Sequence, residues 1–172
     1  PVNIYEANIG SWKMKKDFTD EEDGEFYTYE EMIDLLIPYL VENNYTHLEL
    51  MPLTEFPFDG SWGYQVTGYY SITSRYGTPK EFMKFVNACH KAGIGVIMDF
   101  VPAHYVKDGH GLYKFDGGFV YDYPDINQRY TEWDSVYFDV GRDEVRSFLM
   151  SSVGFLAEYF HIDGIRFDAI SN

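Results

Sequence analysis

The fold is decided by one short apolar run, Gly95-Val96-Ile97-Met98-Asp99-Phe100-Val101. Asp99 is its single charged residue, and such a run is typical of a parallel strand that is covered on both faces. Three further strands are expected at residues 2–7, 47–51 and 164–170. Helical patterns separate these strands along the chain. This alternation predicts an α/β fold with a parallel sheet and right-handed crossovers.

The first two helices are predicted from their start signals and their apolar spacing. Each begins with a capping-box pattern, Thr28-Tyr29-Glu30-Glu31 or Thr78-Pro79-Lys80-Glu81, whose side chains satisfy free backbone N–H groups. Apolar residues then recur at three- and four-residue spacing, which gives each helix one buried stripe. We expect the first helix to kink at Pro38 and to end at Asn43-Asn44, and the second to end at Gly93.

Long connections follow the carboxyl ends of the second and third strands. Residues 56–70 are rich in Gly and aromatic side chains, and residues 102–141 are expected to form an inserted loop region before a helix at about residues 143–160. Parallel α/β folds place ligands at these strand ends. The four strand–helix units predict a partial (β/α)8 TIM barrel, because a complete barrel takes eight units and about 250 residues.

Charge and cysteine content narrow the possible partners. The chain carries 28 Asp and Glu against 13 Lys and Arg, a formal charge of −15, whereas a nucleic-acid binder needs a basic excess. No window approaches the ~18 to 20 apolar residues of a membrane helix, so we expect neither nucleic acid nor a membrane as a partner. The single Cys89 is expected to be a packed thiol, and this cysteine usage favours a cytoplasmic location.

Charged residues inside the predicted strands mark the candidate site. Arg166 and Asp168 are two residues apart on the fourth strand and therefore project to the same face. A guanidinium beside Asp168 would favour its ionised form, as a nucleophilic carboxylate requires. Asp99 lies near the end of the third strand, five residues before His104. A buried ion-pair network with a purely structural role is the alternative for Arg166 and Asp168 alone, but the agreement of two strand ends favours catalysis.

Two segments at these strand ends resemble a known family. Asp99-Phe100-Val101-Pro102-Ala103-His104 and Gly164-Ile165-Arg166-Phe167-Asp168-Ala169 resemble the first and second signature regions of the α-amylase superfamily. Within it, the chain is most similar to the 1,4-α-glucan branching enzymes, on the segments Tyr5-Glu6-Ala7-Asn8-Ile9-Gly10-Ser11-Trp12, Glu49-Leu50-Met51-Pro52 and Gly60-Ser61-Trp62-Gly63-Tyr64-Gln65-Val66-Thr67-Gly68-Tyr69-Tyr70. The resemblance runs essentially end to end and implies that residues 1–172 are the amino-terminal half of a catalytic (β/α)8 barrel.

The resemblance implies a role for each candidate residue. Asp168 would be the nucleophile that attacks the anomeric carbon of an α-1,4-linked glucose and forms a glycosyl-enzyme, and Arg166 would orient it and keep it ionised. His104 would hydrogen-bond the hydroxymethyl group of that sugar, and Asp99 would support the network around Arg166. Tyr64 would be an aromatic platform under the sugar, with packing inside its own loop as the alternative.

The implied activity is transfer rather than hydrolysis. In a branching enzyme the 6-hydroxyl of a glucan chain resolves the glycosyl-enzyme, so an α-1,4 linkage is cleaved by a retaining double displacement and an α-1,6 branch of glycogen is formed. The expected partners are α-1,4-glucan chains and the remainder of the enzyme. The retaining mechanism needs a second carboxyl group. In the family it follows the fifth strand, so we expect it beyond Asn172 and expect the fragment alone to be inactive.

Departures from the amylase pattern bear on metals and on the acceptor. Ala103 stands where calcium-dependent amylases usually have a metal-ligating Asn, so no calcium is expected there. Ile170-Ser171 stand where amylases often have Lys-His, which moves the interpretation away from hydrolysis. The histidines form no H-E-x-x-H motif or tight ligand pair, so no catalytic metal and no cofactor is expected.

Three alternatives stay open from the sequence. They are an α-glucan hydrolase of the same superfamily, either amylase-like or trehalose-releasing; a non-catalytic partial barrel that binds glucan; and a doubly wound nucleotide-binding domain. The last lacks a Gly-rich phosphate loop, because Ala7-Asn8-Ile9-Gly10 is no G-x-G-x-x-G motif. A half-barrel is also expected to expose strand edges and an apolar inner face, and therefore to be marginally stable or self-associating.

Overall fold

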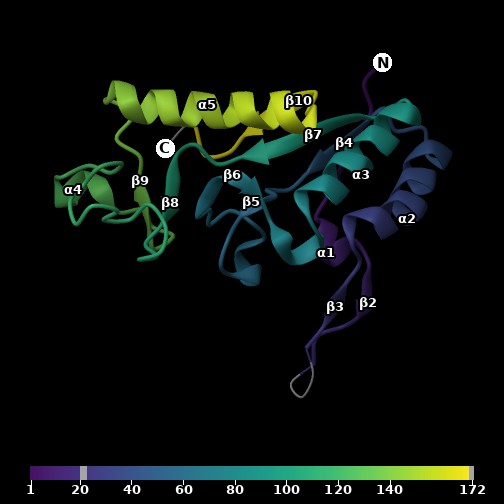
Figure 1. Ribbon diagram of the computed structural model, residues 1–172, viewed down its shortest axis with the longest axis horizontal. Helices are drawn as coiled ribbons and strands as arrows, with labels where there is room; N and C mark the ends of the chain where they lie inside the picture. The colour runs from purple at the N-terminus through teal and green to yellow at the C-terminus, as the bar shows by residue number, and fades with distance from the viewer. Residues whose placement is uncertain (20–22, 171–172) are drawn as a thin grey trace.

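The centre of the molecule is a four-stranded parallel sheet with the strand order β1-β4-β7-β10 (Figure 1). The computed structural model describes residues 1–19 and 23–170. Its sheet strands are β1 (Ile4–Ala7), β4 (His47–Leu50), β7 (Gly95–Phe100) and β10 (Gly164–Phe167). Each strand pairs with the next one of the sheet in chain order, so the sheet grows by one unit at a time. This topology confirms the predicted α/β class and is that of the first part of a barrel.

Three long helices connect these strands. They are α2 (Tyr29–Glu42), α3 (Pro79–Lys91) and α5 (Asp143–Phe160), and both predicted capping boxes are present at the starts of α2 and α3. The α2 helix continues through Pro38, whose side chain lies on the exposed side, and ends before Asn43 as expected. Cys89 is buried in α3, which confirms a packed thiol, and burial raises the pKa of this thiol to about 12. Among the described residues, no helix has the length and apolarity that a membrane span requires.

Residues alternate between two faces of the sheet. The apolar residues of the strands are buried in one core with the apolar stripes of the helices; from the strands these include Leu48, Leu50, Val96, Met98 and Phe100. The opposite face carries charged groups, because the register pairs Glu6 with Glu49 and Arg166 with Asp99. The predicted apolar inner face is therefore a mixed one, because Ile4 and Ile97 share it with the charged residues of the strands.

All four strands are shorter than the sequence prediction: β4 and β7 end one residue earlier, at Leu50 and Phe100, and β1 and β10 differ more. β1 begins at Ile4, and Val2 lies outside it with its side chain 70% exposed. β10 ends at Phe167 instead of continuing to Ile170. Ala169 has a φ of 53°, in the left-handed region, so the chain turns away from the sheet just after Asp168. Asp168 therefore stands at the carboxyl end of the strand.

The connections contain short elements that the sequence analysis did not predict. Three two-stranded antiparallel sheets pair β2 (Met14–Lys16) with β3 (Glu25–Phe26), β5 (Thr54–Glu55) with β6 (Gly68–Ile72), and β8 (His104–Val106) with β9 (Ser135–Tyr137). Short helices are α1 (Ile9–Trp12), η1 (Asp59–Ser61), η2 (Ser74–Tyr76) and α4 (Ile126–Arg129). Elements of two to five residues are too short for an apolar period to reveal them.

Candidate active site

The candidate site lies at the carboxyl ends of β7 and β10, where Arg166 connects two carboxylates. Arg166 Nη1 donates to Asp99 Oδ2 at 3.0 Å and to Asp168 Oδ1 at 2.8 Å. Asp99 is the register partner of Arg166 on the neighbouring strand, and Asp168 follows the end of the Arg166 strand. One guanidinium nitrogen thus holds carboxylates from two strands in a single cluster.

Tyr64 joins this cluster from the loop before β6. Its hydroxyl donates to Asp99 Oδ2 at 2.6 Å, across 35 residues of sequence. Burial, together with the hydrogen bond to Asp99, raises the pKa of the Tyr64 phenol, so the group is protonated and acts as a donor at neutral pH. The structure therefore brings Tyr64, Asp99 and Arg166 together, and the ring lies beside the predicted nucleophile.

Asp99 is the most buried member of the cluster. The residue has no exposed surface, and burial raises the pKa of its carboxyl group to about 6. The hydrogen bond from Tyr64 and the charge of Arg166 oppose that rise, whereas the carboxylates of Glu49 and Glu6 add to it. Asp99 therefore lies between two hydrogen-bond donors, Tyr64 and Arg166, and two carboxylates, Glu6 and Glu49.

His104 begins β8 and is held by a hydroxyl group from β9. The distance from His104 Nδ1 to Ser135 Oγ is 3.0 Å, and Ser135 Oγ in turn lies 2.5 Å from Thr131 Oγ1. Burial lowers the pKa of His104 below its ordinary value of 6.5, although the charge of Asp168 opposes this shift. The imidazole is therefore neutral at pH 7, with Nε2 as the ring nitrogen available to a ligand.

A cavity of about 490 Å³ collects most of these side chains; its lining consists of Ser61, Tyr64, Gln65, His104, Trp133, Asp168 and Ala169. The structure thus brings four of the five predicted site residues into one hydrogen-bonded cluster, Tyr64, Asp99, Arg166 and Asp168, and places His104 in the wall of the same cavity.

Trp133 is a cavity residue that sequence reasoning missed. Its ring centroid lies 5.2 Å from that of His104, and its side chain is 39% exposed. Gln65 Nε2 donates to the Trp133 carbonyl at 3.2 Å, which ties the loop before β9 to the loop before β6. The presence of a tryptophan in a polar loop segment could have indicated a ligand-binding ring. The sequence does not show which cavity such a ring would line.

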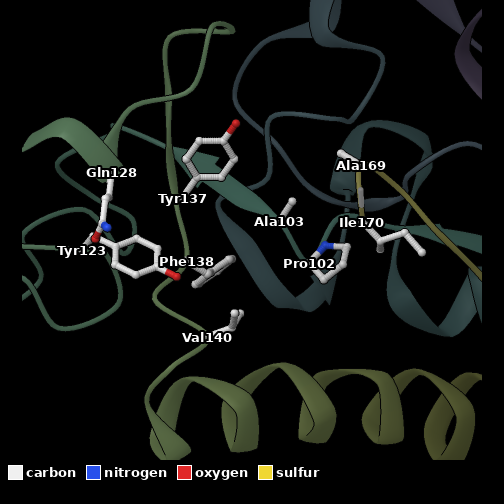
Figure 2. A pocket seen from close by; sticks show the side chains of 9 residues that line it. All are labelled: Pro102, Ala103, Tyr123, Gln128, Tyr137, Phe138, Val140, Ala169 and Ile170. Atoms are coloured by element: carbon white, nitrogen blue, oxygen red, sulfur yellow. The ribbon is translucent and has the colours of Figure 1, made fainter. Parts of the chain in front are cut away.

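A second cavity of about 540 Å³ shares Ala169 with the first, and Figure 2 shows the side chains that line this second cavity. Its lining consists of Pro102, Ala103, Tyr123, Gln128, Tyr137, Phe138, Val140, Ala169 and Ile170. Although this cavity is the larger one, its lining includes no carboxylate, imidazole or basic side chain, so the charged groups of the candidate site are gathered at the smaller cavity. Ile170 lines it, whereas Ser171, the other residue of the predicted departure, lies outside the described residues.

The fold and the cavity define a class of protein: a partial parallel barrel with a carboxylate, a guanidinium and aromatic rings at its strand ends. The family model described as "Alpha amylase, catalytic domain" matches residues 16–117, more than half of the chain. The chain belongs to this family, which confirms the resemblance seen in the sequence.

Two of the curated relatives carry the name of a particular enzyme of this family. The chain is 58% identical over 172 residues to a protein of Fusobacterium nucleatum named 1,4-alpha-glucan branching enzyme GlgB, covering 100% of this chain and 27% of the relative. It is 56% identical over 173 residues to a protein of the same name from Geobacillus stearothermophilus, covering 100% of this chain and 26% of the relative. The chain thus spans about a quarter of the length of the curated relatives it matches.

Solved structures agree on the fold. A Salmonella typhimurium protein gives a TM-score of 0.75 at 29% identity, over 99% of this chain and 26% of that chain. A maltogenic alpha-amylase from Thermotoga neapolitana gives a TM-score of 0.73 at 24% identity, over 98% of this chain and 39% of that chain, which shows the fold alone.

Proposed function

We propose that this chain is part of the catalytic barrel of a 1,4-α-glucan branching enzyme. The observation that carries the proposal is the cluster in which Arg166 holds Asp168 and Asp99 while Tyr64 donates to Asp99. A chain 58% identical to a protein with that name supports the choice of reaction. We propose residues 1–172 as the amino-terminal half of the barrel and residues 102–141 as its inserted loop region.

Asp168 is the nucleophile in this proposal. Its carboxylate attacks the anomeric carbon of an α-1,4-linked glucose, the bond to the leaving 4-oxygen breaks, and a covalent glycosyl-enzyme forms. A second carboxyl group protonates the leaving oxygen; we place it in the part of the longer relatives that this chain does not span. The same group then accepts the proton of a glucan 6-hydroxyl as that oxygen attacks the anomeric carbon and releases Asp168. Two inversions give an α-1,6 linkage with net retention.

Arg166 and Asp99 prepare the nucleophile. The guanidinium at 2.8 Å favours the ionised form of Asp168 and fixes its direction. Asp99 holds that guanidinium from the opposite side at 3.0 Å, and the Tyr64 hydroxyl keeps Asp99 in place. These three residues are positioned by two strands and one loop, so the arrangement is available before substrate binds.

The sugar at the cleavage point lies between aromatic and polar walls in this proposal. Tyr64 offers a ring face to its C–H groups, Trp133 offers a second ring, and neutral His104 hydrogen-bonds the hydroxymethyl group. The adjoining cavity, with its Tyr123 and Tyr137 rings, continues the path for neighbouring glucose units of the chain. We further propose a cytoplasmic location, on the single reduced Cys89.

Hydrolysis of α-glucan is the second candidate, because the chain matches the alpha amylase catalytic domain model and is 29% identical to the solved Salmonella typhimurium protein, whose name includes the words alpha amylase. The two reactions differ in whether water or a glucan 6-hydroxyl resolves the glycosyl-enzyme. The deciding experiment incubates the full-length protein with amylose and measures both new α-1,6 linkages and released reducing sugar, with Asp168→Asn as the inactive control. We expect new α-1,6 linkages; release of free sugar without them would overturn the branching assignment.

A further inference from the structure

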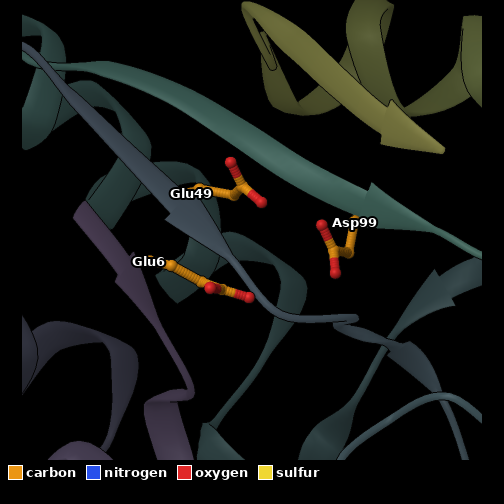
Figure 3. Close-up of side chains that lie close together, drawn as sticks. All are labelled: Glu6, Glu49 and Asp99. Atoms are coloured by element: carbon orange, nitrogen blue, oxygen red, sulfur yellow. The ribbon is translucent and has the colours of Figure 1, made fainter. Parts of the chain in front are cut away.

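Three carboxyl groups converge on the charged face of the sheet, and one of them, Asp99, also belongs to the candidate site. Glu6 of β1, Glu49 of β4 and Asp99 of β7 come from three neighbouring strands, and one carboxyl oxygen from each lies within 4.8 Å of the others (Figure 3). Register explains the arrangement, since Glu6 pairs with Glu49 and both face the same side as Asp99.

One oxygen of this group is buried without a hydrogen-bond partner. Asp99 has no exposed surface, and its Oδ2 accepts from Tyr64 and Arg166. Its Oδ1 has no hydrogen-bond partner within the part of the chain that the structure describes. Figure 3 shows the Asp99 carboxyl group directed toward the space between Glu6 and Glu49. A buried carboxylate oxygen costs free energy unless a donor or a cation meets it, so this atom points to a ligand in that space.

The carboxylates around Asp99 outnumber the cations that contact them, which also favours a bound cation. Arg166 contacts Asp99 but is shared with Asp168, and therefore neutralises at most one of the carboxylates around it. The three carboxyl groups lie close enough to repel one another when ionised, because one oxygen from each lies within 4.8 Å of the others. A cation among the three groups would remove this repulsion and satisfy Asp99 Oδ1 in one step.

We propose that Glu6, Glu49 and Asp99 bind one hard divalent cation of the size of calcium. The donor set consists of carboxylate oxygens, which hard cations prefer over the sulfur and nitrogen ligands of zinc or copper. Oxygens on opposite sides of a Ca²⁺ ion lie about 4.6 to 5.2 Å apart, whereas those on a Mg²⁺ ion lie about 4.2 Å apart at most. The span of up to 4.8 Å fits the larger ion, with waters completing the shell.

The cation would link three strands of the sheet and hold Asp99 with its other oxygen toward Tyr64 and Arg166. Its role is therefore in positioning and stability, without a chemical step at the metal. The inference goes beyond the proposed function and does not depend on which glucan reaction the full protein carries out.

Calcium titration of the full-length protein tests this site. The protein is stripped with EDTA and titrated with CaCl₂ in a calorimeter, alongside Glu49→Gln and Glu6→Gln. The control is Glu42→Gln, which removes an exposed carboxylate at the end of α2, away from the cluster. We expect the wild type to bind one equivalent of calcium. Glu49→Gln and Glu6→Gln should each lower the calcium affinity about tenfold or more, and Glu42→Gln should keep the wild-type affinity. Calcium also raises the melting temperature of the wild type and of the control.

Two results would overturn the site. One is the absence of calcium binding by the wild-type protein. The other is equal stoichiometry and affinity in the wild type and all three variants, which would mean that calcium binds at another place on the protein. If Glu49→Gln fails to fold, Glu6→Gln still decides, because Glu6 is exposed on the edge strand β1.

Discussion

Arg166 and Asp99 face each other across two neighbouring strands, with Arg166 Nη1 at 3.0 Å from Asp99 Oδ2. The same nitrogen lies 2.8 Å from Asp168 Oδ1. The proposed nucleophile is therefore aimed by a side chain that is itself fixed by a fully buried carboxyl group on another strand. This relationship makes the site sensitive to the shape of the Arg166 side chain as well as to its charge.

Replacing Arg166 with Lys should lower kcat of the full-length enzyme about 100-fold. An ammonium group keeps the charge, but it lacks the planar guanidinium that aims Asp168 while holding Asp99. Branching activity and far-ultraviolet circular dichroism of the variant are the measurements. Arg146→Lys is the matched control, because Arg146 pairs with Asp143 on the exposed side of α5 and should keep full activity. Wild-type kcat in Arg166→Lys would contradict the positioning role.

Tyr64→Phe separates the hydroxyl of Tyr64 from its ring. The variant loses the 2.6 Å hydrogen bond to Asp99, and hydrogen bonds to charged groups contribute about 1.5 to 3 kcal/mol. We expect kcat/KM to fall about tenfold or more. Tyr64→Ala should lower kcat/KM further and also raise KM, because this variant removes the proposed aromatic platform as well. Equal kinetics in Tyr64→Phe and wild type would show that the hydroxyl has no part in the site.

Trp133 should contribute to glucan binding more than to the chemical step. Trp133→Ala removes one aromatic wall of the 490 Å³ cavity, and we expect KM for amylose to rise about tenfold with a smaller change in kcat. Trp62→Ala is the control, because Trp62 is 63% exposed and lines neither of the two cavities described above. Similar KM values for the two variants would argue against a specific role of Trp133.

Asp163 should stabilise the fold in a pH-dependent way. Its Oδ2 accepts from Val96 N at 2.7 Å and lies 2.8 Å from His90 Nε2, so it ties the turn before β10 to β7 and α3. Burial opposes ionisation, but the hydrogen bonds from Val96 and His90 prevail and lower the pKa of Asp163 below its ordinary 3.8. The contribution is therefore complete above that pH and is lost as the pH falls through the lower, folded-state value.

Urea unfolding of wild type and Asp163→Ala measures this contribution. Because the side chain is 42% exposed, we expect a loss of only about 1 kcal/mol at pH 7. The difference between the two proteins should shrink when the pH is lowered from 5 to 3. A constant difference across that range would mean that the carboxylate charge makes no contribution.

Local sequence signals determined the three long helices and the four strands of the central sheet. The capping boxes at Thr28 and Thr78 and the long apolar stripes predicted α2 and α3, and the bounds predicted for α5 are those of the structure. The acidic and basic residues inside the strands also identified the site, because burying Asp99 or Arg166 requires a partner or a function. These signals lie within a few residues of one another, so backbone geometry alone translates them into structure.

The contacts that give the site its chemistry were decided by the tertiary structure. Tyr64 reaches Asp99 across 35 residues, Trp133 reaches the cavity from the loop before β9, and Glu6 meets Glu49 and Asp99 on the charged face. Register between parallel strands placed Glu6, Glu49 and Asp99 on one face, and a shift of one residue would turn each of these side chains to the other face. The loops that fold over the strand ends brought Tyr64 and Trp133 to the site. The sequence by itself determined which polar side chains would need a hydrogen-bond or ionic partner. The tertiary structure determined which residues became those partners.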